Sequence, residues 1–490
     1  MRKILLLFIV LVLFASCGSV KRYNKQITTL HPVEDLHTDV DKLYKQLQKH
    51  HPNLYQYTPK AVLDFKFDSL KKTINNPINS RDFYKKLSPV VTHVRQGHVS
   101  VGSVSKQFTK KERKVLKENK FEFYDLDFEY LDNKLWVEDY RGKDSTLIGH
   151  EVVRIADEDA SDLVKTFKTR FASDGFNTTY FNTTISKGFT VFYLRDKGFL
   201  DSLSVTFKVK DSLFERVFRR ISKEEKKDTL GIKDTTLVKK EKPKKLTKDQ
   251  KLEKRLAKRK KRKDNKKYGY LSKRNEYIRN FNFIGRDSTV GYMKLRSFTD
   301  GNYKNFYNES FKKLDSAKTK YFILDLRDNG GGRIAEIDYL YSFLTDEDYQ
   351  FITESEVNSR TPFLKTMMAN TTPNSLKVAG ALLSPIVVVH NLLKTKKRDG
   401  KLYYRFNKHS KIKAPNPLNY KGKMYVLING NSFSASSLLS THLKATKRPQ
   451  KQEPDGYGVK PDVEIIPTIN DKNSKKDPEL EWILSDIDQN

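Results

Sequence analysis

Cysteine is almost absent from this sequence of 490 residues, in which Cys17 is the only one. A single cysteine cannot form an intramolecular disulfide, and it excludes a zinc site built from several thiolates. Histidine offers no substitute, because His50, His51 and His93 show no metal-ligand spacing with carboxylates. We therefore expect neither a metal ion nor another cofactor in this protein.

The N-terminal apolar run is too short to cross a membrane. Residues Ile4–Phe14 follow the basic Met1–Lys3 and fall well short of the roughly 20 residues that a spanning helix needs. Small residues lead directly into Cys17, which resembles the cleavage site of bacterial lipoproteins. We expect a signal peptide at 1–16, a tether at 17–34, and a cell-envelope protein held at the membrane by acyl chains on Cys17. The alternative is an ordinary cleaved signal in which Cys17 has no role.

Acidic residues are outnumbered by basic ones, with 60 Asp or Glu against 94 Lys or Arg and a net charge of +34. Lys239–Lys267 alone holds 17 Lys or Arg and 4 Asp or Glu, a net +13. Such a stretch has little to bury, so we expect a solvated helix or disorder within an insertion spanning 214–280. The stretch Lys239–Lys267 has no aromatic residue for base stacking, which argues against specific nucleic-acid binding. It is either a soluble spacer or a surface for an anionic envelope polymer or lipid.

Two small domains are expected before this insertion. Residues 35–115 place apolar side chains at three- and four-residue steps, which predicts a helical cap. Residues 116–213 alternate apolar and polar side chains, which predicts β structure. Within them, Leu147–Ile155 resembles a hairpin of PDZ domains, although His150 replaces the usual Asp. This PDZ-like domain either holds a peptide at its sheet edge or is purely structural.

Strand-like and helical segments alternate after the insertion, so residues 281–490 predict an α/β core. Val290–Phe298 is expected to be its first strand. Tyr321–Gly332 is an apolar strand that runs into three consecutive glycines. Met424–Ile428 is a second strand, and it leads into the serine-rich turn of Asn429–Leu439.

Each of these two loops is a weak sign of catalysis when taken alone. Consecutive glycine N–H groups can stabilise a developing negative charge, but they also bind phosphate or allow close packing. A serine at a strand-to-helix junction can be an exposed nucleophile, whereas the same cluster can simply cap the helix. Ser432, Ser434 and Ser436 are the three candidates.

Together, Asp325–Gly332 and Ser434–Ser436 resemble the tail-specific, or carboxy-terminal processing, family of serine peptidases. That family pairs a D-L-R-x-N-x-G-G loop with an S-A-S turn. The resemblance implies an α/β peptidase core that is preceded by a helical cap and a PDZ-like domain and acts on polypeptides. It also implies that Ser434 is the nucleophile and that the N–H groups of Gly331 and Ala435 form the oxyanion hole.

The core is shorter than those of its relatives after Arg448. One branch of the family carries a lysine base on a segment that is absent here. Lys460 stands at about the right offset from the serine, but it lies inside a later G-x-x-P-D element. The missing segment also leaves open a catalytically inactive protein that keeps the fold as a binding scaffold.

The tricorn-like branch of the family uses histidine instead. Gln96–Val101 resembles the short motif that delivers this histidine, which nominates His98 as the general base. The acid that orients it lies just before a G-V-x-P-D-V element, which nominates Asp455 or Glu453. The alternative is that His98 is only structural.

The sequence therefore predicts a cell-envelope serine endopeptidase that hydrolyses extended or unfolded polypeptides. The alternative is an inactive peptidase-fold scaffold of the envelope that binds polyanions through its basic insertion.

Overall fold

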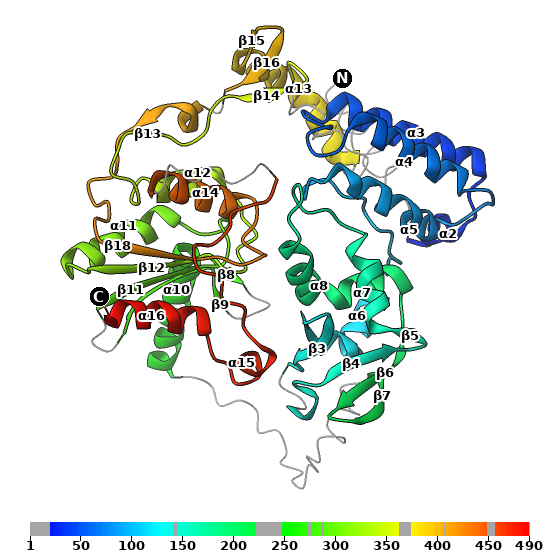
Figure 1. Cartoon of the computed structure of the whole chain (residues 1–490), viewed down its shortest axis with the longest axis horizontal. Coiled ribbons are helices and arrows are strands. Elements are labelled where there is room, and N and C mark those ends of the chain that lie inside the picture. The colour runs from blue at the N-terminus through cyan, green and yellow to red at the C-terminus, as the bar shows by residue number, and fades with distance from the viewer. Residues whose placement is uncertain are drawn as a thin grey trace.

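A computed structural model describes residues 20–141, 145–221, 247–271, 276–285, 289–361, 374–405, 407–447 and 456–489. The signal peptide and Cys17 lie outside these ranges, so lipidation stays a prediction. Within them, no helix combines the length and the apolar character needed to cross a bilayer. Figure 1 shows two lobes, one made of the N-terminal helices and a β domain, and the other made of an α/β core.

The N-terminal cap consists of α2 (Val20–Thr28), α3 (Val33–His50), α4 (Lys60–Lys72) and α5 (Ser80–Val91). Apolar residues at helical spacing pack into one shared core that includes Leu36, Val40, Phe67 and Leu70. Asn79 caps α5, because its side chain accepts hydrogen bonds from the N–H groups of Arg81 and Asp82. The chain then passes through Arg95, at a left-handed φ of 56°, into the loop that carries His98.

A seven-stranded sheet forms the second domain, in the order β1-β7-β6-β4-β3-β2 with β5 paired to β4. The strands are β1 (Lys120–Phe121), β2 (Asp127–Leu131), β3 (Lys134–Asp139), β4 (Glu151–Ile155), β5 (Glu158–Asp159), β6 (Ser202–Val209) and β7 (Ser212–Ile221). Helix α6 (Lys110–Glu118) precedes the sheet, and α7 (Ala160–Lys168) and α8 (Thr179–Lys197) pack on it through a phenylalanine-rich core. The domain continues past the expected boundary at 213, because β7 pairs with β6 as far as Arg219. The PDZ-like interpretation stays a prediction.

Part of the basic insertion is helical. Helix α10 (Lys248–Tyr268) has no buried residue, and a capping box of Thr247 and Gln250 begins it. Its last turn contacts the core, where Tyr268 packs against apolar side chains and Lys267 forms an ion pair with Glu309. A solvated helix is thus one of the two forms expected for this tract. The expected boundary at 280 falls inside the next strand.

The core domain is a four-stranded sheet with helices on both faces, which confirms the predicted α/β core. Its order is β10 (Arg279–Ile284), β11 (Val290–Leu295), β12 (Tyr321–Asp325) and β18 (Lys423–Leu427). β10 is antiparallel to β11, and the other neighbours are parallel. Helices α11 (Tyr303–Ser316), α12 (Ile334–Tyr341) and α14 (Ala435–Lys447) cover one face, and α16 (Pro478–Gln489) covers the other through Ile483 and Ile487.

An arm leaves the core between α12 and β18. First, β13 (Tyr349–Gln350) pairs with β17 (Ile412–Lys413). Beyond this pair lie β14 (Ser355–Val357), α13 (Asn374–Lys394), β15 (Thr395–Arg398) and β16 (Lys401–Tyr404). In Figure 1, β14, β15 and β16 lie at the top, away from the core sheet, and α13 runs from them toward the N-terminal helices. We call the described residues 355–361 and 374–405 the arm. The remaining short elements are β8 (Tyr270–Leu271), β9 (Glu276–Tyr277) and α15 (Ile469–Asn473).

Candidate active site

The two predicted loops lie side by side because β12 and β18 are parallel neighbours. Asp325, the last residue of β12, pairs with Leu427, the last residue of β18. Both strands therefore end at the same edge of the sheet, where α/β proteins usually place their sites. Ser432 joins the two loops, since its hydroxyl donates to the carbonyl of Leu326 at 2.8 Å and accepts from the N–H of Asn429 at 3.0 Å. This serine is thus structural.

Ser434 is held in a backbone conformation that few residues other than glycine adopt. Its φ is 57°, and it directly precedes the first turn of α14. A strained serine at a strand-to-helix turn is typical of an exposed nucleophile. The third candidate, Ser436, is fully buried, and its hydroxyl has no hydrogen-bond partner in the described part of the chain. Only Ser434 has the geometry of a nucleophile.

The imidazole of His98 reaches Ser434 from the other lobe. Its Nε2 lies 3.1 Å from Ser434 Oγ, although 336 positions separate the two residues in the chain. Asp174 fixes the loop, because its Oδ1 accepts a hydrogen bond from the N–H of Gly97 at 2.7 Å. Lys460, the alternative base, forms no hydrogen bond with Ser434 in the described structure; its carbonyl accepts one from the amine of Lys444.

Phe433, which the sequence did not single out, lies between the two lobes. Its ring stacks on Tyr180 of α8 at 4.8 Å and contacts the His98 ring at 5.0 Å. Gly97 must be small here, since a Cβ atom at this position would lie 2.6 Å from Phe433 Cζ. Phe433, the residue before Ser434, therefore helps to set the position of the His98 ring. Its adjacency to Ser434 was the only available sequence signal.

Gly331 lies against the nucleophile turn, as the oxyanion-hole prediction requires. A Cβ atom on it would lie 2.8 Å from Ala435 N and 2.8 Å from Ser434 Cβ, and its φ is 94°. Only glycine fits this close approach. Its N–H is not free, however, because it donates to Asn329 Oδ1 at 2.9 Å. The Ala435 N–H lies in the first turn of α14, where amides lack partners within the helix.

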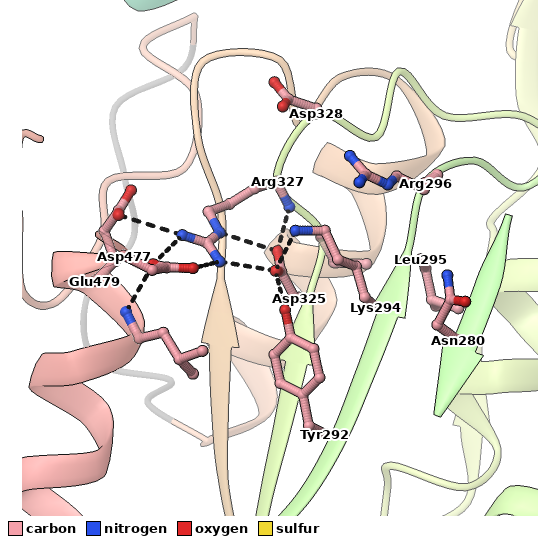
Figure 2. Close-up of polar contacts among 12 residues, drawn as sticks. Asn280, Tyr292, Lys294, Leu295, Arg296, Asp325, Arg327, Asp328, Asp477 and Glu479 are labelled. Carbon is pink, nitrogen blue, oxygen red and sulfur yellow. Dashed lines mark hydrogen bonds and ion pairs between the residues drawn. The ribbon is translucent and has the colours of Figure 1, made fainter. Parts of the chain in front are cut away.

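A buried ion-pair network surrounds the end of β12, where the glycine loop (Asp325–Gly332) begins (Figure 2). Asp325 is fully buried and accepts hydrogen bonds from Tyr292 at 2.6 Å and from the Arg327 side chain at 2.9 and 3.1 Å. Lys294 lies 3.1 Å from the same carboxylate. Burial raises the pKa of Asp325, but Arg327 and Lys294 outweigh this effect and lower the pKa to about 2. The carboxylate is therefore ionised at neutral pH.

Arg327 extends this network to the C-terminal helix. Its guanidinium donates to both carboxylate oxygens of Asp477, at 2.7 and 2.8 Å, and lies 3.2 Å from Glu479 (Figure 2). Burial opposes the charge of Arg327, but the hydrogen bonds to Asp477 and Asp325 raise its pKa overall. The start of α16 is thereby fixed to the residue that begins the glycine loop.

Asp328 links the glycine loop to the serine turn and to the other lobe. Its Oδ1 accepts hydrogen bonds from Asn429 and Asn431, both at 3.1 Å. Its Oδ2 lies 3.6 Å from Lys187 Nζ on α8. Burial raises the pKa of Asp328, and Lys187 with the two amides lowers it to a net value below the usual range. Asp328 therefore helps to hold the glycine loop and the serine-rich turn in position relative to each other.

The nominated acids, Asp455 and Glu453, lie outside the described residues. The chain that follows them is described and lies near the histidine loop. The carbonyl of Gly456 accepts a hydrogen bond from the N–H of Phe176 at 2.7 Å, and the N–H of Gly175 donates to the carbonyl of Arg95 at 2.8 Å. No cluster of three or more potential metal ligands occurs within the described ranges.

Comparisons with known proteins agree with this geometry. Residues 289–451, which include both loops, match the sequence model of peptidase family S41. The chain is similar to the structure of mature CPAF complexed with lactacystin, with a TM-score of 0.54 and 13% identity over 93% of this chain and 98% of that chain. It is also similar to the s499a mutant of CPAF, with a TM-score of 0.51 and 13% identity over 85% and 82% of the two chains. No curated protein matches the sequence. At this identity the structures establish a shared fold.

Proposed function

We propose that Ser434 and His98 carry out the reaction of this protein, which is a serine-type peptidase whose residues 289–451 match the sequence model of peptidase family S41. The observation that carries this proposal is the 3.1 Å separation between His98 Nε2 and Ser434 Oγ. A serine hydroxyl is a weak nucleophile at neutral pH and needs an adjacent base. The short distance to Ser434 Oγ supports His98 as this base.

In the proposed reaction, Ser434 Oγ attacks the peptide carbonyl while His98 Nε2 takes its proton. His98 then donates this proton to the leaving amine, which yields an acyl-enzyme that water hydrolyses. The negative charge on the carbonyl oxygen develops beside Ala435 N–H and Gly331. For Gly331 N–H to donate to this oxygen, the hydrogen bond to Asn329 Oδ1 must first break. Asp455 or Glu453 would orient the imidazole.

The proposed substrates are extended or unfolded polypeptides of the cell envelope. A serine and a histidine supplied by different lobes leave a site between two domains, and peptide substrates are commonly bound in such positions. Lipidation of Cys17 would hold the enzyme at the membrane. Incorporation of labelled palmitate into the wild type and its loss in Cys17→Ser would support the anchor, whereas equal labelling of both would exclude it.

A fluorophosphonate probe tests the nucleophile. The wild type should be labelled covalently and should cleave an unfolded protein, and Ser434→Ala should do neither. Ser437→Ala is the matched control, because it changes a serine three residues further along α14 and should keep the activity. Labelling of Ser434→Ala at the wild-type level would contradict the assignment.

The inactive scaffold remains the second candidate function, and one observation favours it. The Gly331 N–H donates a hydrogen bond to Asn329 Oδ1, so one of the two N–H donors expected in the oxyanion hole already has a partner. An unlabelled wild type that still binds unfolded polypeptide would select this function. Polyanion binding by the exposed α10 is a separate activity, and it predicts salt-sensitive binding that is lost when residues 239–267 are deleted.

A further inference from the structure

Helix α13 carries an uncharged stretch that is unusual for this chain. Charged residues make up 31% of the sequence, yet none occurs in the 16 residues from Val378 to Leu393. The helix extends over Asn374–Lys394 in the arm. A stretch of this kind is normally buried in a core or placed against another apolar surface.

The outward face of α13 is aliphatic and exposed. Ile386, Val389 and Leu393 follow one another at helical spacing and are 68%, 56% and 76% exposed, and Leu392 beside them is 46% exposed. On the opposite face, Asn391 is buried at 1% exposure. The two faces thus depart from the usual amphipathic pattern, in which the exposed face is polar. Exposed aliphatic patches of this type mark surfaces that bind a partner or a membrane.

Basic residues directly follow this apolar stripe. The segment from 394 to 405 contains six Lys or Arg and one Asp. Arg398 and Lys401 form ion pairs with Glu354 and Glu356, at 3.0 Å each. Lys396 and Lys397 are exposed, and neither forms an ion pair within the described residues.

We propose that the arm binds an anionic lipid surface, with Ile386, Val389 and Leu393 inserted at the acyl boundary and Lys396 and Lys397 at the phosphates. This pattern of aliphatic residues beside lysines is typical of helices that lie in the membrane interface. A second copy of the chain is disfavoured as the partner, because it carries the same net charge of +34. The stripe is open to solvent in the folded chain, because Ile386, Val389 and Leu393 are each more than half exposed. The proposal does not rest on peptidase activity.

The single cysteine permits a direct test in the full chain. In a Cys17→Ser background, Leu393→Cys creates one site for an environment-sensitive fluorophore such as NBD. Leu213→Cys is the matched control, because Leu213 is also exposed (61%) but lies on β7, outside both basic segments. Vesicles of phosphatidylcholine with phosphatidylglycerol should shift the emission of the label at 393 to shorter wavelength and brighten it, whereas the label at 213 should keep its aqueous emission wavelength.

A second measurement separates insertion from simple charge attraction. Ile386→Glu with Val389→Glu should weaken vesicle binding by about tenfold or more, because burial of one aliphatic side chain favours binding by at least that factor. Leu213→Glu on β7, where the leucine is 61% exposed, should leave binding unchanged. Hydrolysis of a soluble peptide should be equal in all variants.

Two results would overturn the proposal. One is an aqueous label at 393 while the protein is fully bound to vesicles. The other is a blue shift that appears without vesicles and grows with protein concentration, accompanied by dimers in sedimentation that the Ile386→Glu/Val389→Glu variant lacks. That second result would assign the stripe to contacts between copies of the chain.

Discussion

At the scale of single residues, the sequence was most informative where a short motif marks a candidate catalytic group. Ser434 and His98 were predicted from short motifs, and the structure places their reacting atoms 3.1 Å apart. Phe433 and Asn329 were not predicted. Their roles depend on packing between segments distant in sequence, in which the Phe433 ring meets His98 and Asn329 binds the Gly331 N–H. No local pattern encodes contacts of this kind.

The contact between Gly97 and Phe433 yields the first prediction. Gly97→Ala should lower kcat by about 10²-fold while the thermal midpoint changes little, because the new methyl group would displace the histidine loop. Phe433→Leu in the same chain should restore part of the loss by making room. If Gly97→Ala retains full kcat, or if the double variant is no better than the single one, Phe433 does not position the base.

At the scale of secondary-structure elements, the α/β core was predictable because β12 is an almost continuous apolar run. The connection between β12 and α16 was not predictable. Arg327 and Asp477 are 150 positions apart, and nothing in their local sequence indicates that they form a bidentate ion pair. The pair fixes two elements that flank the glycine loop, so its loss should affect the whole core.

Arg327→Met should therefore reduce the free energy of unfolding by about 3–5 kcal/mol, since it leaves the Asp325 carboxylate buried with fewer partners. Urea denaturation measures this change. The control is Arg296→Met, which removes the basic partner of a partly exposed ion pair with Glu276 at 3.2 Å. It should lower the free energy of unfolding by about 1 kcal/mol or less. Equal effects of the two variants would show that the network contributes no special stability.

The same network predicts how stability depends on pH. The pKa of Asp325 is about 2 in the folded protein, which is below the value of 3.8 for an unperturbed carboxyl. Its contribution is thus fully present above about pH 4 and is lost as the pH falls toward 2, by roughly 2 kcal/mol in total. Urea midpoints measured between pH 6 and pH 2.5 should fall less steeply for Asp325→Asn than for the wild type. Parallel curves would contradict the assigned pKa.

At the scale of the whole molecule, the site is divided between two lobes. The helical cap supplies His98, the β domain supplies Tyr180, and the α/β core supplies Ser434 and its supporting loops. The sequence predicted the order of these domains, but it could not place the cap loop against the core, because relative domain positions depend on many weak long-range contacts. Lys187 with Asp328 and Phe176 with Gly456 are two of them.

The central claim is that His98 is the base for Ser434, and a comparison of kcat/KM for three proteins tests it most directly. With an unfolded polypeptide as substrate, His98→Ala should lower kcat/KM by several orders of magnitude, as in triads whose members act together. Lys460→Ala should retain most of the wild-type value, because Lys460 forms no hydrogen bond with Ser434 in the described structure. Full activity in His98→Ala together with its loss in Lys460→Ala would contradict the account.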